Sequence, residues 1–427
     1  MFLIYRFLTI LLYPIFVLLI YFRKLLNKED NSRYKEKIFR LERSKNNKEK
    51  KLIWFHGASI GEIASVKPVI KKILEENNKF NILITSNTFS SGKMIEKDFR
   101  ENNNISHYYF PLDVPFLIQK FLNYWKPDLA IFIDSEIWPN YIFELKKRKV
   151  NLVLINGRIT NKTFERWKFF KKFSNHLFSS FNVCFASSKD SFKKLKELGV
   201  KNLKYYGNLK FISTKKNDQK LDKSIINFFD KHEVWCAAST HEGDEMFCIK
   251  THKKLKINYR NTLTIIIPRH ITRIKKIFSK CKKNNISAQI FNEGDKIQED
   301  TELLLINSFG ALPKYYNYCK SVLMGKSTDR KLIKVAGQNP LEAIRAGCHV
   351  YHGPYVYNFQ EIYDFLNSEK IASKVENIDQ LVNRLEEDFK KPKNTYFEKI
   401  NELEKYGSKI LLNTTSELKK VINYEIF

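Results

Sequence analysis

The sequence predicts an α/β protein made of two doubly wound, Rossmann-like domains, and three observations support this prediction. The 427 residues are too many for one ordinary hydrophobic core, and a hydrophobic content of 43% is enough to fill two. Short apolar runs alternate with stretches of helical periodicity, which is typical of a parallel sheet covered by helices on both faces. This alternation stops at the polar stretch 213–223 and then starts again.

The first 24 residues are predicted to be a separate element. Residues 2–22 are almost wholly apolar, interrupted by Arg6 and Pro14, and their number matches the thickness of a bilayer's hydrocarbon core. We predict an N-terminal membrane-anchor helix at 1–24. A helix lying in the membrane interface is the alternative, because Arg6 and Pro14 weaken a continuous span. A basic linker, 25–50, follows, and the positive-inside tendency predicts that the rest of the chain lies on the cytoplasmic face of the inner membrane.

Residues 51–211 are predicted to form the first domain and residues 212–427 the second. Apolar runs followed by turns mark the strands of the first domain at 52–55, 81–85, 129–133, 152–156, 183–186 and 203–206. The strands of the second are predicted at 234–238, 263–267, 288–291, 303–306, 321–324 and 349–352, and charged amphipathic helices at 379–390 and 398–423 end the chain. Two such domains are expected to face each other across a ligand-binding cleft.

The charge and the cysteines restrict the function classes. A formal charge of +29, from 75 Lys and Arg against 46 Asp and Glu, fits nucleic acid, an anionic membrane, an acidic substrate or a chain-wide drift in composition. Six cysteines show no Cys-x-x-Cys pair and no zinc-ligand spacing, so we expect reduced, buried thiols and no metal site. No recognition motif supports binding to nucleic acid.

Polar residues recur on short loops between strands and helices. The first such loop runs from His56 to Glu62, and Glu62 lies in the first turn of the helix that follows. Complementing the helix dipole explains a lone glutamate there. Similar loops occur at 135–136, 239–242, 268–270 and 339–342. A shared cleft at the carboxyl edges of the strands is the simplest explanation for all of them.

Seven segments of the chain occur in the order found in one family. They are Trp54-Phe55-His56-Gly57-Ala58-Ser59-Ile60-Gly61-Glu62, Ser135-Glu136-Ile137-Trp138-Pro139-Asn140, Asn156-Gly157-Arg158, Gly207-Asn208-Leu209-Lys210-Phe211, Ala238-Ser239-Thr240-His241-Glu242-Gly243, Pro268-Arg269-His270 and Asn339-Pro340-Leu341-Glu342. Together they resemble the 3-deoxy-D-manno-octulosonic acid (Kdo) transferases of lipopolysaccharide assembly, and the resemblance covers nearly the whole chain. It implies the two-domain glycosyltransferase fold called GT-B.

The resemblance also implies roles for particular residues. Glu62 is similar to the family's general base, and Glu136 and Lys210 match positions that stabilise the transition state. The matching site for cytidine monophosphate (CMP) comprises Pro268, Arg269, Phe309, Gly310, Ala311, Asn339, Pro340, Leu341 and Glu342. Simpler explanations stand beside two of these assignments. Lys210 is also consistent with an ordinary solvated lysine. Residues 339–342 are also consistent with a helix start resembling a capping box, with Asn at the N-cap, Pro at N1 and Glu at N3.

Two loops depart from the family pattern. Residues 307–312 align with a nucleotide-contacting loop that usually reads Asp-x-Met-Gly-Glu-Leu, so that Ala311 stands in place of an acid. The usual Gly-Gly-Ser reads Gly325-Lys326-Ser327, and Gln338 replaces a histidine.

The resulting prediction is a membrane-anchored, inverting glycosyltransferase without cofactor or metal. It is expected to move Kdo from CMP-Kdo to lipid IVA, the phosphorylated disaccharide precursor of lipid A, with the first domain binding the acceptor and the second the donor. The expected partners are therefore CMP-Kdo, the lipid A precursor and anionic lipids of the inner membrane, but no nucleic acid. One alternative is a related transferase for another nucleotide sugar. The other, from a different class, is a membrane-tethered binder of polyanions or nucleic acid, for which the charge is the only support.

Overall fold

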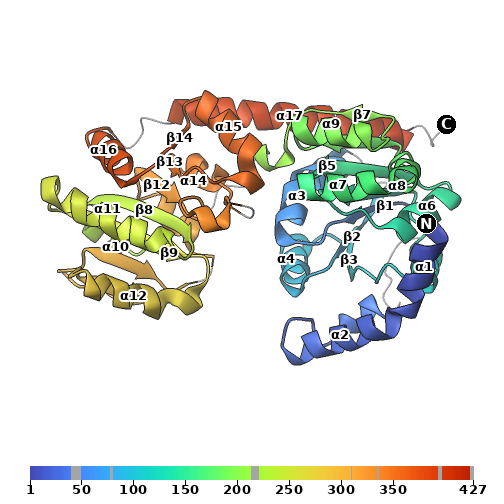
Figure 1. Cartoon of the computed structure of the whole chain (residues 1–427), viewed down its shortest axis with the longest axis horizontal. Coiled ribbons are helices and arrows are strands. Elements are labelled where there is room, and N and C mark those ends of the chain that lie inside the picture. The colour runs from blue at the N-terminus through green and yellow to red at the C-terminus, as the bar shows by residue number, and fades with distance from the viewer. Residues whose placement is uncertain are drawn as a thin grey trace. The chain divides into compact units, whose positions relative to one another are not determined.

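The computed structural model describes all residues except 40–49, 77–79, 213–220, 309, 334–335, 393–396 and 424–427. The chain divides into two compact units (Figure 1). The first contains Met1–Thr214 together with Tyr406–Phe427, and the second contains Lys215–Lys405. Each unit has one seven-stranded parallel sheet, which confirms the predicted α/β class with two doubly wound sheets.

The first sheet has the strand order β3-β2-β1-β4-β5-β6-β7. The strands are β1 (Lys51–His56), β2 (Phe80–Ser86), β3 (Ile105–Tyr109), β4 (Leu129–Ile133), β5 (Asn151–Gly157), β6 (Val183–Ala186) and β7 (Leu203–Lys204). Their central members are buried along their whole length because helices cover both faces. The helices are α3 (Ile60–Glu76), α4 (Phe89–Phe99), α5 (Pro115–Trp125), α6 (Pro139–Lys147), α7 (Asn161–Phe169), α8 (Lys171–Phe178) and α9 (Lys189–Glu197). The strand order reverses between β1 and β4, so the crevice of this sheet lies at their carboxyl ends.

The second sheet has the order β10-β11-β9-β8-β12-β13-β14 and reverses between β8 and β12. Its strands are β8 (Glu233–Thr240), β9 (Thr262–Pro268), β10 (Ala288–Phe291), β11 (Leu303–Ile306), β12 (Ser321–Met324), β13 (His349–His352) and β14 (Ala372–Lys374). The helices of this unit are α10 (Lys223–Phe229), α11 (Asp244–Asn258), α12 (Ile274–Lys283), α13 (Leu312–Tyr316), α14 (Leu341–Arg345), α15 (Gln360–Ser368) and α16 (Ile378–Phe389). The edge strands β3 and β14 were not predicted from sequence. Polar residues interrupt β3, and β14 has only three residues.

The last helix, α17 (Phe397–Asn423), belongs to both units. Sequence analysis assigned the whole of 212–427 to one domain, whereas residues from Tyr406 onward group with the first unit. Gly407 lets α17 lie close to the backbone of Phe211 in the first unit, because a Cβ atom at residue 407 would be 2.3 Å from the carbonyl oxygen of Phe211. The ring of Tyr406 packs on the ring of Phe211, and Lys419 forms an ion pair of 2.7 Å with Glu76.

The N-terminal residues form two helices, and the prediction of a single anchor helix at 1–24 was wrong. Helices α1 (Phe2–Leu11) and α2 (Tyr13–Leu25) meet at a bend of 51° (Figure 1). Pro14 explains the break, since a proline has no N–H to donate and its ring clashes with the carbonyl group four residues earlier. Within the described residues no single helix is both long and apolar enough to cross a bilayer, and only this bent pair has the required length and composition.

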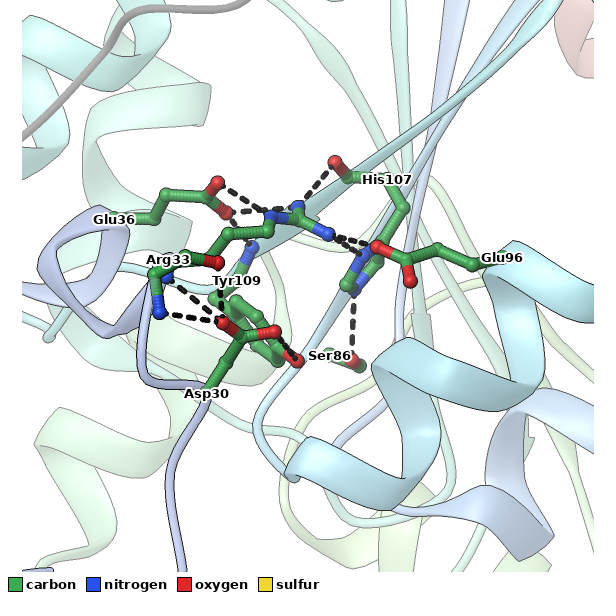
Figure 2. A network of polar contacts seen from close by, with 8 residues as sticks. Asp30, Arg33, Glu36, Ser86, Glu96, His107 and Tyr109 are labelled. Carbon is green, nitrogen blue, oxygen red and sulfur yellow. Dashed lines mark hydrogen bonds and ion pairs between the residues drawn. The ribbon is translucent and has the colours of Figure 1, made fainter. Parts of the chain in front are cut away.

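Part of the predicted linker packs on the first unit. A short 3-10 helix, η1 (Tyr34–Lys37), follows α2, and Arg33 just before it lies against β3 and α4. Figure 2 shows the guanidinium group of Arg33 between the carboxylates of Glu36 and Glu96, with a further hydrogen bond of 2.8 Å to the carbonyl group of His107. Residues 40–49 of the predicted linker lie outside the described residues.

Candidate functional site

Two glutamates follow the central strands of the first sheet at the point where the strand order reverses. Glu62 lies in the first turn of α3, directly after β1, and Glu136 lies in the loop between β4 and α6. Both side chains therefore reach the crevice at the carboxyl ends of β1 and β4, which is where open α/β sheets bind ligands. The structure brings these two predicted residues together.

The carboxylate of Glu62 is held by its own turn. It accepts hydrogen bonds of 2.7 Å from the backbone N–H of Ala58 and of 2.8 Å from the hydroxyl group of Ser59. Burial raises the pKa of Glu62 to about 7, and the negative charge of Glu136 adds to this shift. At neutral pH Glu62 is therefore present in both forms, which is the condition under which a carboxyl group exchanges protons most effectively.

Glu136 is the end point of a chain of hydrogen-bond donors. The Nε2 atom of His56 and the indole Nε1 of Trp138 lie 3.0 Å and 2.7 Å from Oε2 of Glu136. His56 is fully buried, and its Nδ1 atom lies 3.0 Å from the hydroxyl group of Thr85, which in turn accepts from Trp54. A proton on Nε2 of His56 would be donated to Glu136, while Nδ1 accepts from the hydroxyl group of Thr85, and this arrangement satisfies every member of the chain.

These donors set the charge of Glu136. Burial alone would raise the pKa of Glu136, but the hydrogen bonds from His56 and Trp138 hold that pKa below its usual range. The two carboxyl groups thus lie in environments that push their pKa values apart, so that one stays ionised while the other takes up or releases a proton. Such a pair is typical of an acid or base next to a charge-stabilising group.

Lys210 supplies a cation in the same neighbourhood. It lies in the 3-10 helix η2 (Leu209–Phe211), and Asn156 at the end of β5 fixes this helix by accepting a 3.0 Å hydrogen bond from the N–H of Leu209. Burial lowers the pKa of the Lys210 ammonium group, and the charges of Asp134, Arg158 and Glu62 also act on it. Lys210 is therefore a partly buried cation close to these charged groups, and not an ordinary solvated lysine.

Sequence reasoning did not single out Asp134 and assigned no role to Arg158, although Arg158 lies in one of the seven family-like segments; both carry charges that act on Lys210. Asp134 directly follows β4 in a left-handed conformation, with φ of 59°, and its carbonyl oxygen accepts from the N–H of Arg158. A left-handed backbone at a residue other than glycine is uncommon and concentrates at functional sites. The position of Asp134 immediately after a buried strand was the signal that could have identified it.

In the second unit a buried aspartate joins two loops at the reversal between β8 and β12. Asp244 accepts hydrogen bonds from the backbone N–H groups of His241 and Lys326, at 2.8 Å and 2.6 Å, and from the hydroxyl group of Thr328 at 2.6 Å. Gly325 permits this close packing, because a Cβ atom there would lie 2.6 Å from the carbonyl oxygen of Ser239.

Basic side chains gather beside this junction. Arg269 follows β9, is exposed, and donates its backbone N–H to the carbonyl group of Thr240. The rings of His241 and His270 pack edge to face with their centroids 5.5 Å apart. Lys326 has a left-handed backbone with φ of 57°, and burial lowers its pKa while the positive charge of Arg269 lowers it further. The predicted residue Arg269 thus lies among other basic groups, an arrangement suited to an anion.

The remaining predicted residues lie on two loops and a strand end of the second unit. Pro268 is buried at the end of β9, Gly310 has φ of 75°, and Ala311 is buried at the start of α13. Phe309 lies outside the described residues. The predicted capping arrangement at 339–342 was wrong: α14 begins at Leu341, with Pro340 as its N-cap residue.

The helix starts late because Asn339 makes a turn before it. The side chain of Asn339 accepts a 3.2 Å hydrogen bond from the N–H of Leu341, which is two residues later. Such a turn competes with helical backbone geometry and is a common alternative role for asparagine. Asn339 and Glu342 are both exposed at this helix start, while Pro340 and Leu341 are buried.

Within the part of the chain that the structure describes, no group of three or more His, Cys, Asp or Glu residues is arranged to hold a metal ion. The six cysteines are buried thiols that form no disulfide bond.

Residues 32–213 match the family described as 3-Deoxy-D-manno-octulosonic-acid transferase (kdotransferase). A 3-deoxy-D-manno-octulosonic acid transferase of Rickettsia bellii is 33% identical over 384 residues, covering 90% of this chain and 89% of the relative. Another, from Haemophilus influenzae, is 29% identical over 319 residues, covering 74% and 73%. Among solved structures, the glycosyltransferase of kitacinnamycin has a TM-score of 0.53 at 9% identity, covers 87% of this chain and 99% of that one, and shows the fold alone.

Proposed function

Because this chain belongs to the 3-deoxy-D-manno-octulosonic acid (Kdo) transferase family, we propose that it is an inverting glycosyltransferase that moves Kdo from CMP-Kdo to lipid IVA. Membership of the family makes it a glycosyltransferase, and its two parallel sheets have the GT-B type of architecture. The observation that carries the proposed reaction is the pair of carboxyl groups in the first unit, Glu62 and Glu136, whose pKa values are pushed apart.

In this reaction Glu62 is the general base. The hydroxyl oxygen of the acceptor attacks the anomeric carbon of Kdo, the bond from that carbon to the phosphate oxygen breaks, and CMP leaves with the bonding electrons. The acceptor's proton passes to Glu62. A pKa of about 7 supports this role, since it leaves a substantial fraction of Glu62 ionised at neutral pH without making the carboxylate a poor proton acceptor.

Glu136 and Lys210 supply opposite charges to the transition state. Positive charge develops on the sugar ring as the bond to the leaving group breaks, and the ionised Glu136 opposes it. Negative charge develops on the leaving phosphate, and a cation such as Lys210 compensates it. The low pKa of Glu136 and the partial burial of Lys210 both strengthen these effects, because charges act more strongly away from water.

The second unit is proposed to hold the donor through its basic cluster. CMP-Kdo carries a phosphodiester and a carboxylate, and Arg269 and Lys326 offer two cations at the carboxyl ends of β9 and β12. Pro268, residues 309–311 and residues 339–342 are the proposed nucleotide contacts. Asn339 and Glu342 are exposed and able to reach a ligand. Since lysine and arginine compensate the single leaving phosphate, the proposed reaction needs no metal ion.

The decisive experiment is transfer by the purified enzyme with CMP-Kdo and lipid IVA, read out by the mass of the product. We expect the lipid to gain one or more Kdo residues, and we expect the same yield when a metal chelator is present. A yield that vanishes with chelator and returns with magnesium would contradict the metal-independent reaction.

The choice of nucleotide is tested in the same preparation by thermal unfolding. CMP should raise the unfolding temperature more than uridine diphosphate does, because only a ligand that binds the folded state stabilises it and the stronger ligand stabilises more. The opposite ranking would favour the alternative reaction with another nucleotide sugar.

We also propose that α1 and α2 hold the enzyme on the cytoplasmic face of the inner membrane without a continuous span. Their outward side chains are apolar and strongly exposed, as at Leu3 (77%) and Leu18 (69%), while Arg23 and Lys24 in the last turn of α2 suit anionic headgroups. This corresponds to the interfacial alternative for residues 1–24.

Vesicle flotation tests this membrane contact. The double variant Leu3→Glu with Leu18→Glu should bind vesicles of anionic phospholipid at least tenfold more weakly than the parent, because each substitution places a charge where an apolar side chain would enter the lipid. Ile257→Glu is the matched control, since Ile257 is also 77% exposed but lies on α11 of the second unit. Equal binding by all three proteins would rule out α1 and α2 as the contact.

A further inference from the structure

Helix α1 turns Tyr5 and Thr9 toward the protein, together with Phe2, whose ring packs on that of Phe143 with the centroids 4.0 Å apart. Most of its other apolar side chains point outward. Tyr5 and Thr9, one helical turn apart, are partly buried against the first unit. Leu3, Phe7 and Leu11 are exposed, at 77%, 64% and 59%. A helix that served only to cover a hydrophobic core would show the reverse pattern. The inward face therefore makes specific polar contacts with the first unit.

Two polar side chains of α1, Tyr5 and Thr9, contact Asp113 and Asn140, and we call these four residues the α1 junction. The hydroxyl group of Tyr5 donates a 2.7 Å hydrogen bond to Oδ2 of Asp113. The side-chain amide of Asn140 donates one hydrogen bond to the hydroxyl group of Thr9, at 3.1 Å, and another to the carbonyl oxygen of Asp113, at 2.7 Å. Asp113 and Asn140 are 7% and 4% exposed, so water does not replace these partners readily.

Asp113 also caps α6. Its carboxylate accepts from the backbone N–H groups of Asn140, at 3.3 Å, and Tyr141, at 3.1 Å, which lie in the first turn of α6. Trp138, the N-cap residue of α6, provides no side-chain cap. Asp113 thus performs the capping function from a distant loop, and Tyr5 contributes a further donor to the same carboxylate.

The α1 junction lies next to the loop that carries Glu136. This loop leaves β4 at Ile133 and ends where α6 begins at Pro139, so the capped first turn of α6 fixes its far end. Trp138 in this loop donates the 2.7 Å hydrogen bond to Glu136. A shift of the first turn of α6 would therefore move both Glu136 and one of its two donors relative to His56.

The rest of the N-terminal segment holds the loop that carries Asp113. In Figure 2 Arg33 and Glu36 lie against β3, where Glu36 accepts a 2.8 Å hydrogen bond from the N–H of Tyr109. The carbonyl oxygen of Lys37 accepts from the N–H of Leu112, directly before Asp113. The contacts of residues 33–37 and of α1 thus converge on the same loop.

We propose that the α1 junction makes helix α1 a positioning element for the Glu136 loop. Seating of α1 on the first unit then sets the geometry of Glu136 and contributes to turnover in addition to membrane binding. The catalytic part of this inference rests on the proposed function, whereas the structural part, the hold of α1 on the first turn of α6, does not.

The test deletes two hydroxyl groups and keeps the apolar surface of α1. Tyr5→Phe combined with Thr9→Val removes the donor to Asp113 and the acceptor for Asn140. On acceptor dispersed in detergent, where membrane recruitment plays no part, we expect kcat to fall about ten- to a hundredfold, since small displacements of a catalytic group have effects of this order. KM for CMP-Kdo should stay unchanged. Hydrogen exchange at the amides of Asn140 and Tyr141 should accelerate.

Tyr13→Phe is the matched control. It also removes one hydroxyl hydrogen bond of the N-terminal helices, but the acceptor is the carbonyl group of Ile38 and not the junction. We expect parental kcat and parental exchange at Asn140 and Tyr141. Unchanged exchange in the Tyr5 and Thr9 variant, or a kcat within twofold of the parent, would overturn the inference. If the parent forms no Kdo product, the proposed function fails, and the exchange rates alone decide whether α1 holds α6.

Discussion

Glu62→Gln should lower turnover by about two to four powers of ten, which is the usual contribution of a general base. The substitution keeps the size of the side chain. Its amide oxygen can still accept from the N–H of Ala58, and its NH2 group can donate to the hydroxyl oxygen of Ser59, so the local turn is retained. CMP binding should change little, because the nucleotide is assigned to the second unit. Single-turnover kinetics and thermal protection by CMP measure the two effects.

The pH dependence of the parent enzyme provides an independent check. Burial and the charge of Glu136 raise the pKa of Glu62 to about 7, so the ionised base accumulates as the pH rises through 7. The value of kcat/KM should therefore increase through this range and become level above it. The Gln variant should lack this rise.

Stability distinguishes the base from a residue that only complements the helix dipole. A dipole role predicts that the Gln variant is less stable by about 0.3–1 kcal/mol and still active. The raised pKa of Glu62 predicts instead that, above pH 7, the Gln variant is more stable than the parent. The folded state takes up a proton on Glu62 more readily than the unfolded state does, so the parent's stability from this group is present below pH 4.5 and is lost as the pH rises through 7. Unfolding in urea at pH 5 and pH 8 measures the difference. If the Glu62→Gln enzyme turned over within a few-fold of the parent, Glu62 would not be the base, and Glu136 would be the next candidate.

The strands of both sheets were predictable because burial on both faces requires continuous apolar runs. Leu129–Ile133 is an example, since all five residues are apolar and all are buried. The same physics explains the failure at β3. In Ile105–Tyr109 a serine and a histidine interrupt the run, because this edge strand is completed by Arg33 and Glu36 from the N-terminal segment and not by a further strand.

The sequence predicted where the candidate site residues lie in the fold, but not which side chains contact them. Glu62 and Glu136 each follow a strand, so their meeting at one sheet edge was expected from the parallel topology. The hydrogen bonds to Glu136 were not expected. His56 reaches Glu136 from another strand and also contacts Thr85 on a third one, and Trp138 contacts Glu136 only through the turn of the loop. Asp113 was missed for the same reason, since its partner Tyr5 is 108 residues away.

Composition alone did not predict that the N-terminal residues form two helices with a bend between them. Residues 2–22 have the length and hydropathy of a membrane span, but hydropathy does not register that Tyr5 and Thr9 lie on one face and bind Asp113 and Asn140. Once those contacts exist, α1 is fixed along the surface of the first unit and the chain bends before Pro14. The apolar face that remains is the outward one.

Lys210→Met should lower kcat and kcat/KM equally, by about two to three powers of ten, as expected when a stabilising charge acts only in the transition state. Methionine keeps the apolar stem that packs in this partly buried position but removes the ammonium group. Burial lowers the pKa of Lys210, so the charge is held there at a cost to folding. The variant should therefore be at least as stable as the parent in thermal unfolding. A lysine that only binds the donor's ground state would give a different result, with KM for CMP-Kdo raised and kcat unchanged.

Lys210→Arg separates charge from geometry in the same assay. Arginine keeps the positive charge but has a planar, longer head group, and η2 holds the backbone of residue 210 through Asn156 and Asn208. We expect the Arg variant to recover only part of the loss, because the site requires a compact cation near Glu62 and Asp134. Lys201→Met, at an exposed position of the same unit, is the control and should turn over like the parent. If Lys210→Met also turned over like the parent, the cation for the leaving phosphate would have to come from the basic cluster of the second unit, and Arg269 would be the first residue to replace.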